Sequence, residues 1–269
     1  MSLKIIVLAK QVPDTRNVGP DAMTPEGTVN RAALPAVFNP EDLNALEQAL
    51  RLKESNPGST ITMITMGLPK AAEVLKEGVY RGADEGILIS DRPLGGADTL
   101  ATSYTLAQAI KKVGDYDIIL CGRQAIDGDT AQVGPQVAEK LGLTQITYTE
   151  EILSIDKEAK KIVAKRHIDG GVETVEGPLP IVVTVNGSAA PCRTRNVKRV
   201  WANKNREFPT WGAADIDADP AQIGKAGSPT NVKAVKSIVF KAKENKTLTS
   251  SDEDIEGLIV ELMESNTIG

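Results

Sequence analysis

The sequence predicts an α/β fold with a mostly parallel, doubly wound sheet, an added antiparallel hairpin and an extended C-terminal arm that ends in a helix. Over residues 4–141, short apolar runs alternate with helix-like stretches of about a dozen residues, which indicates parallel strands covered on both faces. From about Ile146 the rhythm changes to short strands around the turn at 169–171. A polar stretch then leads to a final amphipathic segment. Together these features predict a Rossmann-like core with a projecting arm.

In the first half, each apolar run is followed by a helical pattern. Strands are predicted at 4–8, 59–66, 86–90 and 117–120, and helices at 43–53, 70–80, 99–113 and 131–141. The first helix has a clear start, because Asn39 is a natural N-cap and Pro40 suits the first turn. Glu41 and Asp42 complement the positive end of its dipole.

The second half predicts a hairpin, one more buried strand and an arm. The hairpin strands are expected at 152–156, 161–168 and 172–176, and the apolar run at 179–185 is expected to join the main sheet. A short strand is predicted at 236–240, and the last helix starts near residues 250–253 with apolar residues on one face. We therefore expect an α/β domain over residues 1–225, with a hairpin insertion at about 150–178, and a docking arm over residues 226–269.

Composition and charge exclude several classes of protein. The chain has 269 residues, of which 41% are hydrophobic and 25% charged, as in an ordinary globular protein. A net charge of −5 argues against a nucleic-acid partner. The apolar run at the N-terminus is too short for a signal peptide or a membrane span, so a cytoplasmic protein is expected.

Catalytic and metal-binding residues are scarce. His167 is the single histidine and is interpreted as a solvated structural residue, which leaves little room for histidine-based catalysis. Cys121 and Cys192 lie far apart, so a disulfide framework, a zinc site or an iron–sulfur cluster within the chain is not expected. No nucleophile–base pair stands out, and no catalytic side chain is predicted. Redox chemistry here would require a cofactor.

The evidence for nucleotide binding comes from the carboxyl ends of the predicted strands. Neither a G-x-G-x-x-G fingerprint after the first strand nor a P-loop is present. Ligands of open parallel sheets bind in the crevice outside the carboxyl ends of the strands. The segments that would line it are Leu8–Lys10, Met66–Gly67, Ser90–Asp98 and Cys121–Gly134.

The turn at 127–134 predicts an anion site. If a helix starts at Ala131, the amides of residues 130–133 lie at its N-terminus, where backbone dipoles favour a phosphate. Asp129 is expected to be the N-cap, and Asp127 to accept from ribose hydroxyls or from an amide. The alternative is that Asp129 only caps the helix and Asp127 is solvated.

A second turn, residues 95–103, has similar features. Two glycines and Asp98 precede Thr99, Thr102 and Ser103, which predicts another cradle of amides and hydroxyls. Plain helix capping by Asp98 is the alternative. Two such turns on one sheet edge suggest a ligand with more than one phosphate.

Several strings resemble the β subunits of electron transfer flavoproteins. They are "VLAKQVPD", "NPEDLNALEQALRLKE", "MITMGLP", "GADEGILISDR", "CGRQAIDGDTAQVGPQVAEKLGL" and "DGGVETVEGPLPIVVTV". The resemblance implies a heterodimer with an α subunit that holds most of the electron-transferring FAD. It also implies AMP in the β crevice of simple members and a second FAD in electron-bifurcating members. The implied adenylate contacts are Leu8, Ala9, Asn39, Pro40, Glu41, Asp42, Met66, Ala125, Ile126, Asp127, Gly128, Asp129, Thr130, Ala131, Gln132, Val133, Gly134, Pro135 and Gln136.

Other strings look like the bifurcating subgroup. They are "SDRPLGGADTLATS", "KQVPDT" and "GKAGSPT". In that subgroup NADH would reduce the β-bound FAD, which passes electrons to the α flavin and to a low-potential acceptor such as ferredoxin or flavodoxin. The residues implied to hold the second flavin and its phosphates are Asp91, Gly95, Gly96, Ala97, Asp98, Thr99 and Thr102. The alternatives are a conventional subunit with structural AMP that accepts electrons from acyl-CoA dehydrogenases, and an ATP-binding regulator or ligase on a similar fold.

The segment after the last sheet strand is where this family recognises its flavin dehydrogenase. Here it reads "NGSAAPCRTRNVKRV", and the leucine that the family usually projects is missing. Its basic residues would either meet an acidic partner or simply be solvated; they are Arg193, Arg195, Lys198 and Arg199. Trp201 and Trp211 are candidate interface anchors.

Overall fold

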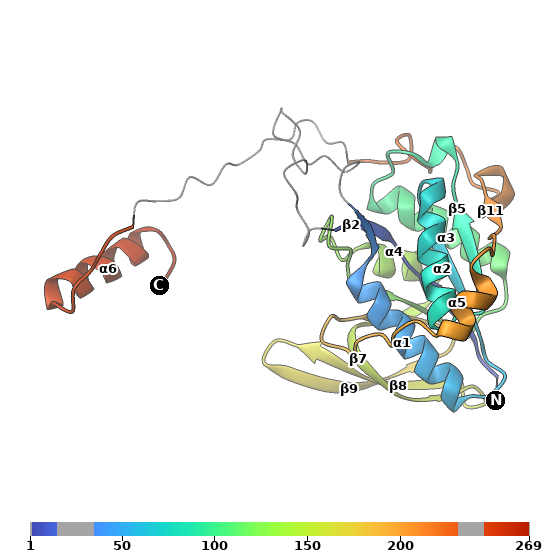
Figure 1. The fold of residues 1–269 in the computed structure, drawn as a ribbon, viewed down its shortest axis with the longest axis horizontal. Helices are drawn as coiled ribbons and strands as arrows, with labels where there is room; N and C mark the ends of the chain where they lie inside the picture. Colours follow the sequence, from blue (N-terminus) through green and yellow to red (C-terminus); the bar gives the residue numbers. More distant parts are fainter. Residues whose placement is uncertain (1, 15–34, 231–244, 269) are drawn as a thin grey trace. The chain divides into compact units, whose positions relative to one another are not determined.

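The computed structural model describes residues 2–14, 35–230 and 245–268. They form two compact units, Met1–Ala234 and Val235–Gly269 (Figure 1). The first unit is the α/β core, and the second contains the helix α6, Asp252–Glu264. The predicted strand at 236–240 lies outside the described residues. Within these described ranges, no helix combines the length and apolar character that crossing a membrane requires.

The core is built on one nine-stranded sheet, which confirms the predicted fold class. Its strand order is β11-β5-β4-β1-β6-β10-β7-β8-β9. The pairs from β11 to β7 are parallel, and β7, β8 and β9 form an antiparallel extension (Figure 1). The strands are β1 Lys4–Leu8, β4 Thr60–Met66, β5 Glu85–Ile89, β6 Ile118–Gly122, β7 Thr144–Asp156, β8 Lys161–Ile168, β9 Gly171–Pro178, β10 Ile181–Val185 and β11 Thr210–Trp211. Two short strands, β2 Gln11–Pro13 and β3 Ala36–Phe38, form a separate ladder.

Helices cover both faces of the sheet. The α-helices of the core are α1 Pro40–Ser55, α2 Ala72–Arg81, α3 Thr99–Val113, α4 Val133–Leu141 and α5 Val197–Asn203, with single turns η2 Pro69–Ala71, η3 Arg92–Leu94 and η4 Ala214–Ile216. Alternate residues of β1 enter opposite hydrophobic clusters: Ile5 and Val7 pack with α1 and α2, and Ile6 packs with α3 and α4. This alternation is the structural basis of the doubly wound arrangement.

The chain reverses its direction of travel across the sheet between β1 and β6. From β1 it proceeds outward to β4 and β5, and then crosses back to β6 and β10 on the other side of β1. The gap between the carboxyl ends of β1 and β6 is therefore a topological switch point. In open α/β sheets such a gap is where ligands bind.

Most element boundaries agree with the predictions, and the differences have local causes. The helix α3 spans the predicted range, and β10 joins the main sheet beside β6 as expected. The helix α4 begins at Val133 instead of 131, because Ala131 has a φ of 52°, in the left-handed region. The strand β7 begins earlier than predicted because its first residues pair with β10 before the hairpin starts.

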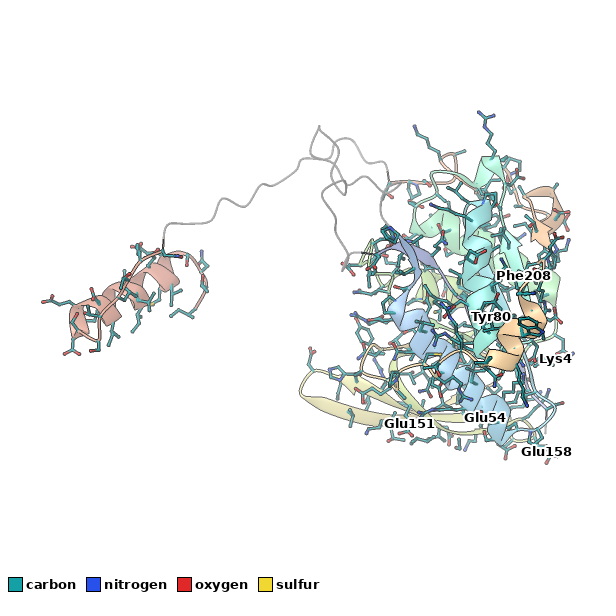
Figure 2. All side chains as sticks on the ribbon, in the orientation of Figure 1. Lys4, Glu54, Tyr80, Glu151, Glu158 and Phe208 are labelled. Atoms are coloured by element: carbon teal, nitrogen blue, oxygen red, sulfur yellow. The ribbon has the colours of Figure 1, made fainter. Side chains whose placement is uncertain are left out.

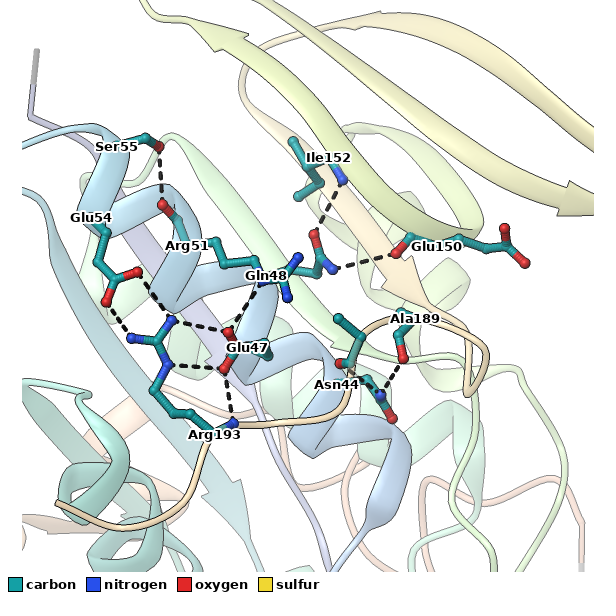
Figure 3. Close-up of polar contacts among 11 residues, drawn as sticks. Asn44, Glu47, Gln48, Arg51, Glu54, Ser55, Glu150, Ile152, Ala189 and Arg193 are labelled. Carbon is teal, nitrogen blue, oxygen red and sulfur yellow. Dashed lines mark hydrogen bonds and ion pairs between the residues drawn. The ribbon is translucent and has the colours of Figure 1, made fainter.

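The helix α1 anchors the segment that follows β10 (Figure 3). The amide of Asn44 donates to the carbonyls of Ala189 and Ala190 at 2.9 and 3.0 Å. Glu47 accepts the backbone N–H and the guanidinium of Arg193 at 3.0 Å each. These bonds attach the segment that follows β10 to a buried helix.

Three of the four basic residues of that segment bond groups within the chain, and their contact with an acidic partner stays a prediction. Arg193 also pairs with Glu54, and Arg195 pairs with Glu77 at 2.7 Å. The guanidinium of Arg199 donates to backbone carbonyls at the end of α2. Of the four predicted cations, only the exposed Lys198 has no such bond among the described residues.

The two tryptophans differ in exposure. Trp201 on α5 is 76% exposed, with the ammonium of Lys204 over its ring. Trp211 lies in β11 and packs against the α3–α4 side of the core, so it is not a free surface anchor. Phe208 packs beside Gly86, where a Cβ would lie 2.8 Å from its ring (Figure 2).

Replacing Glu47 by Ala is expected to lower the free energy of unfolding by about 2 kcal/mol, because the partly buried Arg193 loses its main acceptor. Burial raises the pKa of Glu47, but the hydrogen bonds from Arg193 outweigh it and keep the pKa below the ordinary value of 4.5. This stabilisation is therefore present above pH 4.5 and is lost as the pH falls below it. Urea unfolding at neutral and acidic pH measures both effects.

The matched control is Glu73→Ala, because Glu73 forms an exposed pair with Lys76 on α2. That variant is expected to change the free energy of unfolding by less than about 0.5 kcal/mol. Equal losses for the two variants would contradict an anchoring role for Glu47.

Candidate functional site

A cavity of about 870 Å³ opens at the carboxyl ends of β1, β4, β5 and β6, over the switch point. Four stretches of chain line it, each following one of these strands. The predicted site residues that line the cavity are Leu8, Ala9, Asp42, Met66, Asp91, Gly95, Gly96, Ala97, Asp98, Thr99, Thr102, Ala125, Gly128, Asp129, Thr130, Ala131, Gln132, Val133 and Gly134. The structure therefore brings both predicted turns to one cavity.

The remaining predicted residues are not part of the lining; they are Asn39, Pro40, Glu41, Ile126, Asp127, Pro135 and Gln136. Two of them support the loop that follows β6. Asn39 donates to the carbonyl of Gln124 at 2.9 Å and accepts from the N–H of Ile126 at 3.2 Å. Glu41 accepts the N–H of Gln124 at 2.9 Å and pairs with Arg123. Asn39 is thus at the N-cap position of α1, but its side chain holds the loop instead of capping the helix.

The loop at 130–134 presents a row of unused backbone donors. Among the described residues, no protein acceptor bonds the amides of Thr130, Ala131, Gln132, Val133 or Gly134, and all five residues line the cavity. Val133 is the first residue of α4, so the partial positive charge of the helix end lies beside them. Free amides at a helix N-terminus form an anion site without any lysine.

The backbone conformation of this loop places its N–H groups in a concave arrangement. Asp129 and Ala131 have φ values of 48° and 52°, whereas Gln132 is right-handed. Alternation of left- and right-handed residues forms the concave arrangement of N–H groups that binds anions. Each non-glycine residue in the left-handed region costs roughly 1 kcal/mol. The loop therefore keeps a strained shape that its contacts with Asn39 and Glu41 support.

Comparison with known proteins assigns the chain to a family. The family model described as "Electron transfer flavoprotein domain" matches residues 26–215. The "Electron transfer flavoprotein subunit beta" of Megasphaera elsdenii is 42% identical over 272 residues, which cover 96% of this chain and 99% of the relative. The chain belongs to the electron transfer flavoprotein family. It resembles the β subunits along nearly its whole length.

Two more relatives are similar at the same level. The "Electron transfer flavoprotein subunit beta" of Clostridium acetobutylicum is 46% identical over 231 residues, which cover 86% of each chain. The "Caffeyl-CoA reductase-Etf complex subunit CarD" of Acetobacterium woodii is 45% identical over 230 residues, again 86% of each chain.

In this electron transfer flavoprotein chain, the two acids of the turn at 127–134 bond neighbouring side chains of the protein. Asp127 accepts the ammonium of Lys10 at 2.7 and 3.0 Å. Asp129 accepts the side-chain amide of Gln124 at 2.8 Å. The prediction that Asp129 caps α4 is wrong, because the N-cap position belongs to Gln132. Asp127 was interpreted as an acceptor for ribose or an amide, or as a solvated residue. In the structure its carboxylate forms an ion pair with Lys10 and does not line the cavity.

The second turn differs from the first because its helix end is already capped. The carboxylate of Asp98 accepts the amides of Leu100 and Ala101, both at 3.0 Å, and both donors of Thr230. The hydroxyl of Ser103 is buried and bonds within α3. The hydroxyl of Thr99 donates to Gln132 at 2.8 Å. The predicted cradle is thus reduced to the amides of Gly96 and Ala97 and to the hydroxyl of Thr102.

The wall that contains this turn is fastened by residues from the end of the core. Ser228 accepts the N–H of Asp98 at 2.8 Å, and Gly95 accepts the N–H of Lys225 at 3.1 Å. Gly224 lies so close to the wall that an added Cβ would stand 2.0 Å from the carbonyl oxygen of Pro93. The string "GKAGSPT" is therefore a structural support of the cavity wall.

Several lining residues were not predicted as site residues: Lys10, Ile64, Gly67, Leu68, Pro69, Ile89, Ser90, Arg92, Leu94, Leu106, Cys121, Gly122, Arg123 and Gln124. Most follow directly from the strand ends that the sequence analysis had already named as the crevice. Leu106 lies two turns into α3, and only the apolar face of that helix could have indicated it. The apolar members give the cavity a wall suited to a planar ring.

Replacing Ala131 by Gly is expected to raise the free energy of unfolding by about 1 kcal/mol, because glycine adopts the left-handed region without strain. Ala138→Gly is the matched control within α4, where a buried alanine in a helix is lost and a decrease of about 1 kcal/mol is expected. Chemical denaturation of the two variants beside the parent chain measures the difference. A decrease for both would show that position 131 is not strained.

Replacing Gly134 by Ala is expected to lower the free energy of unfolding by about 1–3 kcal/mol. A Cβ there would meet the Thr184 methyl at 2.7 Å and the Cys121 sulfur at 2.9 Å, so α4 would have to move off the sheet. Gly128→Ala is the control, because its Cβ would meet nothing within 4 Å. Equal thermal shifts for the two variants would contradict this account of the close approach.

Proposed function

We propose that this chain is the β subunit of an electron-bifurcating electron transfer flavoprotein and holds FAD in the cavity at the switch point. The observation that carries the proposal is the row of five unused amides, residues 130–134, at one end of a cavity of about 870 Å³. Gly134 is buried, Ala131 and Val133 are half-buried, and Thr130 and Gln132 are exposed, so these donors are open to an acceptor that enters the cavity. A phosphate-bearing nucleotide supplies such acceptors.

The residues present fit a flavin nucleotide. The amides of 130–134 would hold a phosphate, and the amides of Gly96 and Ala97 offer donors on the opposite wall. Aliphatic side chains between the walls, among them Ile64, Ile89 and Leu94, exclude water from a planar ring. A bound flavin supplies the electron-transfer chemistry, with NADH as the proposed donor. The protein contributes binding, orientation and exclusion of water.

A conventional subunit with AMP in the same cavity is the second candidate, and one observation favours it. The end of α3 is already capped by Asp98, so the second turn provides fewer anion donors than the first. AMP needs a single phosphate site. In that case the role of the chain would be docking to a flavin dehydrogenase such as an acyl-CoA dehydrogenase, and shielding of the flavin of the α subunit. Family membership leaves no support for the third alternative, an ATP-binding regulator.

The proposed partners follow from the two exposed apolar features. The helix α6 exposes Ile255, Leu258 and Ile259, and we infer that this arm docks on the α subunit. Its remaining side chains are largely acidic. Trp201 marks the recognition segment for the dehydrogenase. Ferredoxin or flavodoxin is the proposed low-potential acceptor. The relative from Acetobacterium woodii is named as a subunit of a reductase–Etf complex, which supports a reductase or dehydrogenase as partner.

The decisive experiment is the nucleotide content of the complex after co-expression with the α subunit, measured by acid extraction and chromatography. Two FAD per heterodimer are expected, followed by bleaching of the flavin absorbance with NADH. One FAD and one AMP would establish the conventional alternative, and the absence of any nucleotide in this chain would refute both.

The variant Thr102→Val distinguishes FAD from AMP, because Thr102 lines the cavity wall that FAD would contact and AMP would not. Loss of one FAD per heterodimer, without loss of the fold, is expected for that variant. The control Thr105→Val alters a hydroxyl that bonds within α3 at the carbonyl of Ala101, and is expected to keep both flavins.

A further inference from the structure

The carboxyl ends of β1 and β6 separate at the switch point. The ladder between these strands ends at the pair Val7 and Leu120. Beyond it, each strand bonds its outer neighbour: the N–H of Ala9 donates to β4, and the N–H of Arg123 donates to β10. The inner amides of the two strand ends are thus left facing each other across a gap.

The carboxylate of Asp42 fills this gap. One of its oxygens accepts the N–H of Lys10 and the other accepts the N–H of Gly122, both at 2.8 Å. Gly122 allows the close approach, because an added Cβ would stand 2.5 Å from the Asp42 oxygen. Asp42 therefore sets how far apart the two strand ends lie. It is 6% exposed and lines the floor of the cavity.

The charged groups around Asp42 are neutralised by other partners. The ammonium of Lys10 bonds Asp127, and the guanidinium of Arg123 bonds Glu41. Glu41 itself is a neighbouring negative charge, Asn39 contributes a hydrogen bond, and the Cys121 thiol lies buried beside the carboxyl group. No free cation of the surrounding described elements stabilises the carboxylate, so the two amides are its principal support.

Burial raises the pKa of Asp42 to about 7, although the hydrogen bonds from Lys10 and Gly122 oppose this increase. The carboxyl group therefore exchanges a proton with the solvent near neutral pH. Cys121, the other buried titratable group here, is held neutral because burial raises its pKa far above this range. Because its pKa is near 7, the protonation state of Asp42 at the cavity floor is sensitive to a bound ligand.

We propose that Asp42 is a positioning residue that couples nucleotide binding to the uptake of a proton. The inference rests on the proposed function, because it requires a ligand that carries phosphates. Phosphates held by the amides of 130–134 place negative charge in the same cavity, and the bound nucleotide removes the remaining water from the carboxylate. Both effects favour the neutral carboxyl group. The proton comes from the solvent and stays on a carboxyl oxygen, and no other bond changes.

Protonation changes the contact between the strand ends. A carboxylate accepts at both oxygens, whereas the neutral group has one oxygen that donates. One of the two strand amides then loses its charge-assisted bond, and the new O–H points its proton at a ligand acceptor or at water. Nucleotide binding is linked in this way to the distance between the carboxyl ends of β1 and β6.

The test is isothermal titration of the nucleotide-free complex with FAD, repeated in buffers of different ionisation enthalpy. The two phosphates of FAD form a pyrophosphate that is esterified at both ends, so each carries one strongly acidic group and their charge is constant in this pH range. Net proton uptake is expected near pH 7 and is expected to vanish at about pH 5, where Asp42 already carries its proton. Above neutral pH the affinity is expected to fall by up to about tenfold per pH unit.

Asp42→Asn removes the titrating group with little change of shape, and is expected to abolish both the uptake and the pH dependence. Asp115→Asn is the control, because it alters an exposed carboxylate that pairs with Lys4 at the amino end of β1, outside the cavity lining, and it is expected to retain both. Proton release, or no uptake by the parent complex, would overturn the inference. For a complex that binds AMP but not FAD, the difference in uptake between parent and Asp42→Asn gives the same test, since the AMP phosphate titrates equally in both. Absence of any nucleotide binding refutes the proposed function.

The unfolding of the nucleotide-free chain gives an independent measurement. The pKa of Asp42 is raised above its unfolded value of 3.8, so its contribution to stability is complete below that pH and is lost as the pH rises to about 7. The difference in stability between parent and Asp42→Asn is therefore expected to change across this interval. A constant difference would contradict the titration of Asp42 in the folded protein.

Discussion

The helix α1 carries polar side chains on the surface that it buries, and both functional loops of the protein depend on them. At its N-terminus, Asn39, Glu41 and Asp42 bond the end of β6 and the loop that follows it along the cavity. Further along, Asn44, Glu47 and Gln48 bond the segment after β10 and the start of the hairpin (Figure 3). A buried polar group without a partner costs about 1–3 kcal/mol. Each bond therefore fixes a distant loop as well as stabilising the helix.

The two acids of the turn at 127–134 are consistent with the proposed anion site, because both carboxylates bond other side chains of the protein. Asp127 is paired with Lys10, and Asp129 is turned onto Gln124. Both carboxylates are thereby removed from the row of amides, which remains free for a ligand. An anionic ligand would be attracted by the dipoles of the backbone N–H groups, whose direction the loop fixes. The N-terminus of α3 differs, because the carboxylate of Asp98 already accepts amides there.

Much of the architecture could be predicted because its signals are local. Apolar runs and helical periodicity gave the parallel sheet, and the cap at Asp98 placed the start of α3 correctly. The same cap signal at Asp129 was misleading, because Asp129 is in a left-handed conformation and its carboxylate accepts from Gln124, five residues earlier in the same loop. The bonding partner of Arg193 could not be predicted from nearby residues, because its acceptor Glu47 is 146 residues away in the chain. Which segments line the cavity was predictable from strand ends, but which side chains support them was not.

The fastening of the cavity wall by Ser228 has a consequence for biosynthesis. Asp98 and Ser228 are 130 residues apart, so the wall lacks its support until the ribosome has released almost the entire core. All strands of the nine-stranded sheet precede Ser228 in the chain, and the sheet is able to assemble first. A nascent chain would thus possess its scaffold before the wall of its cavity is complete.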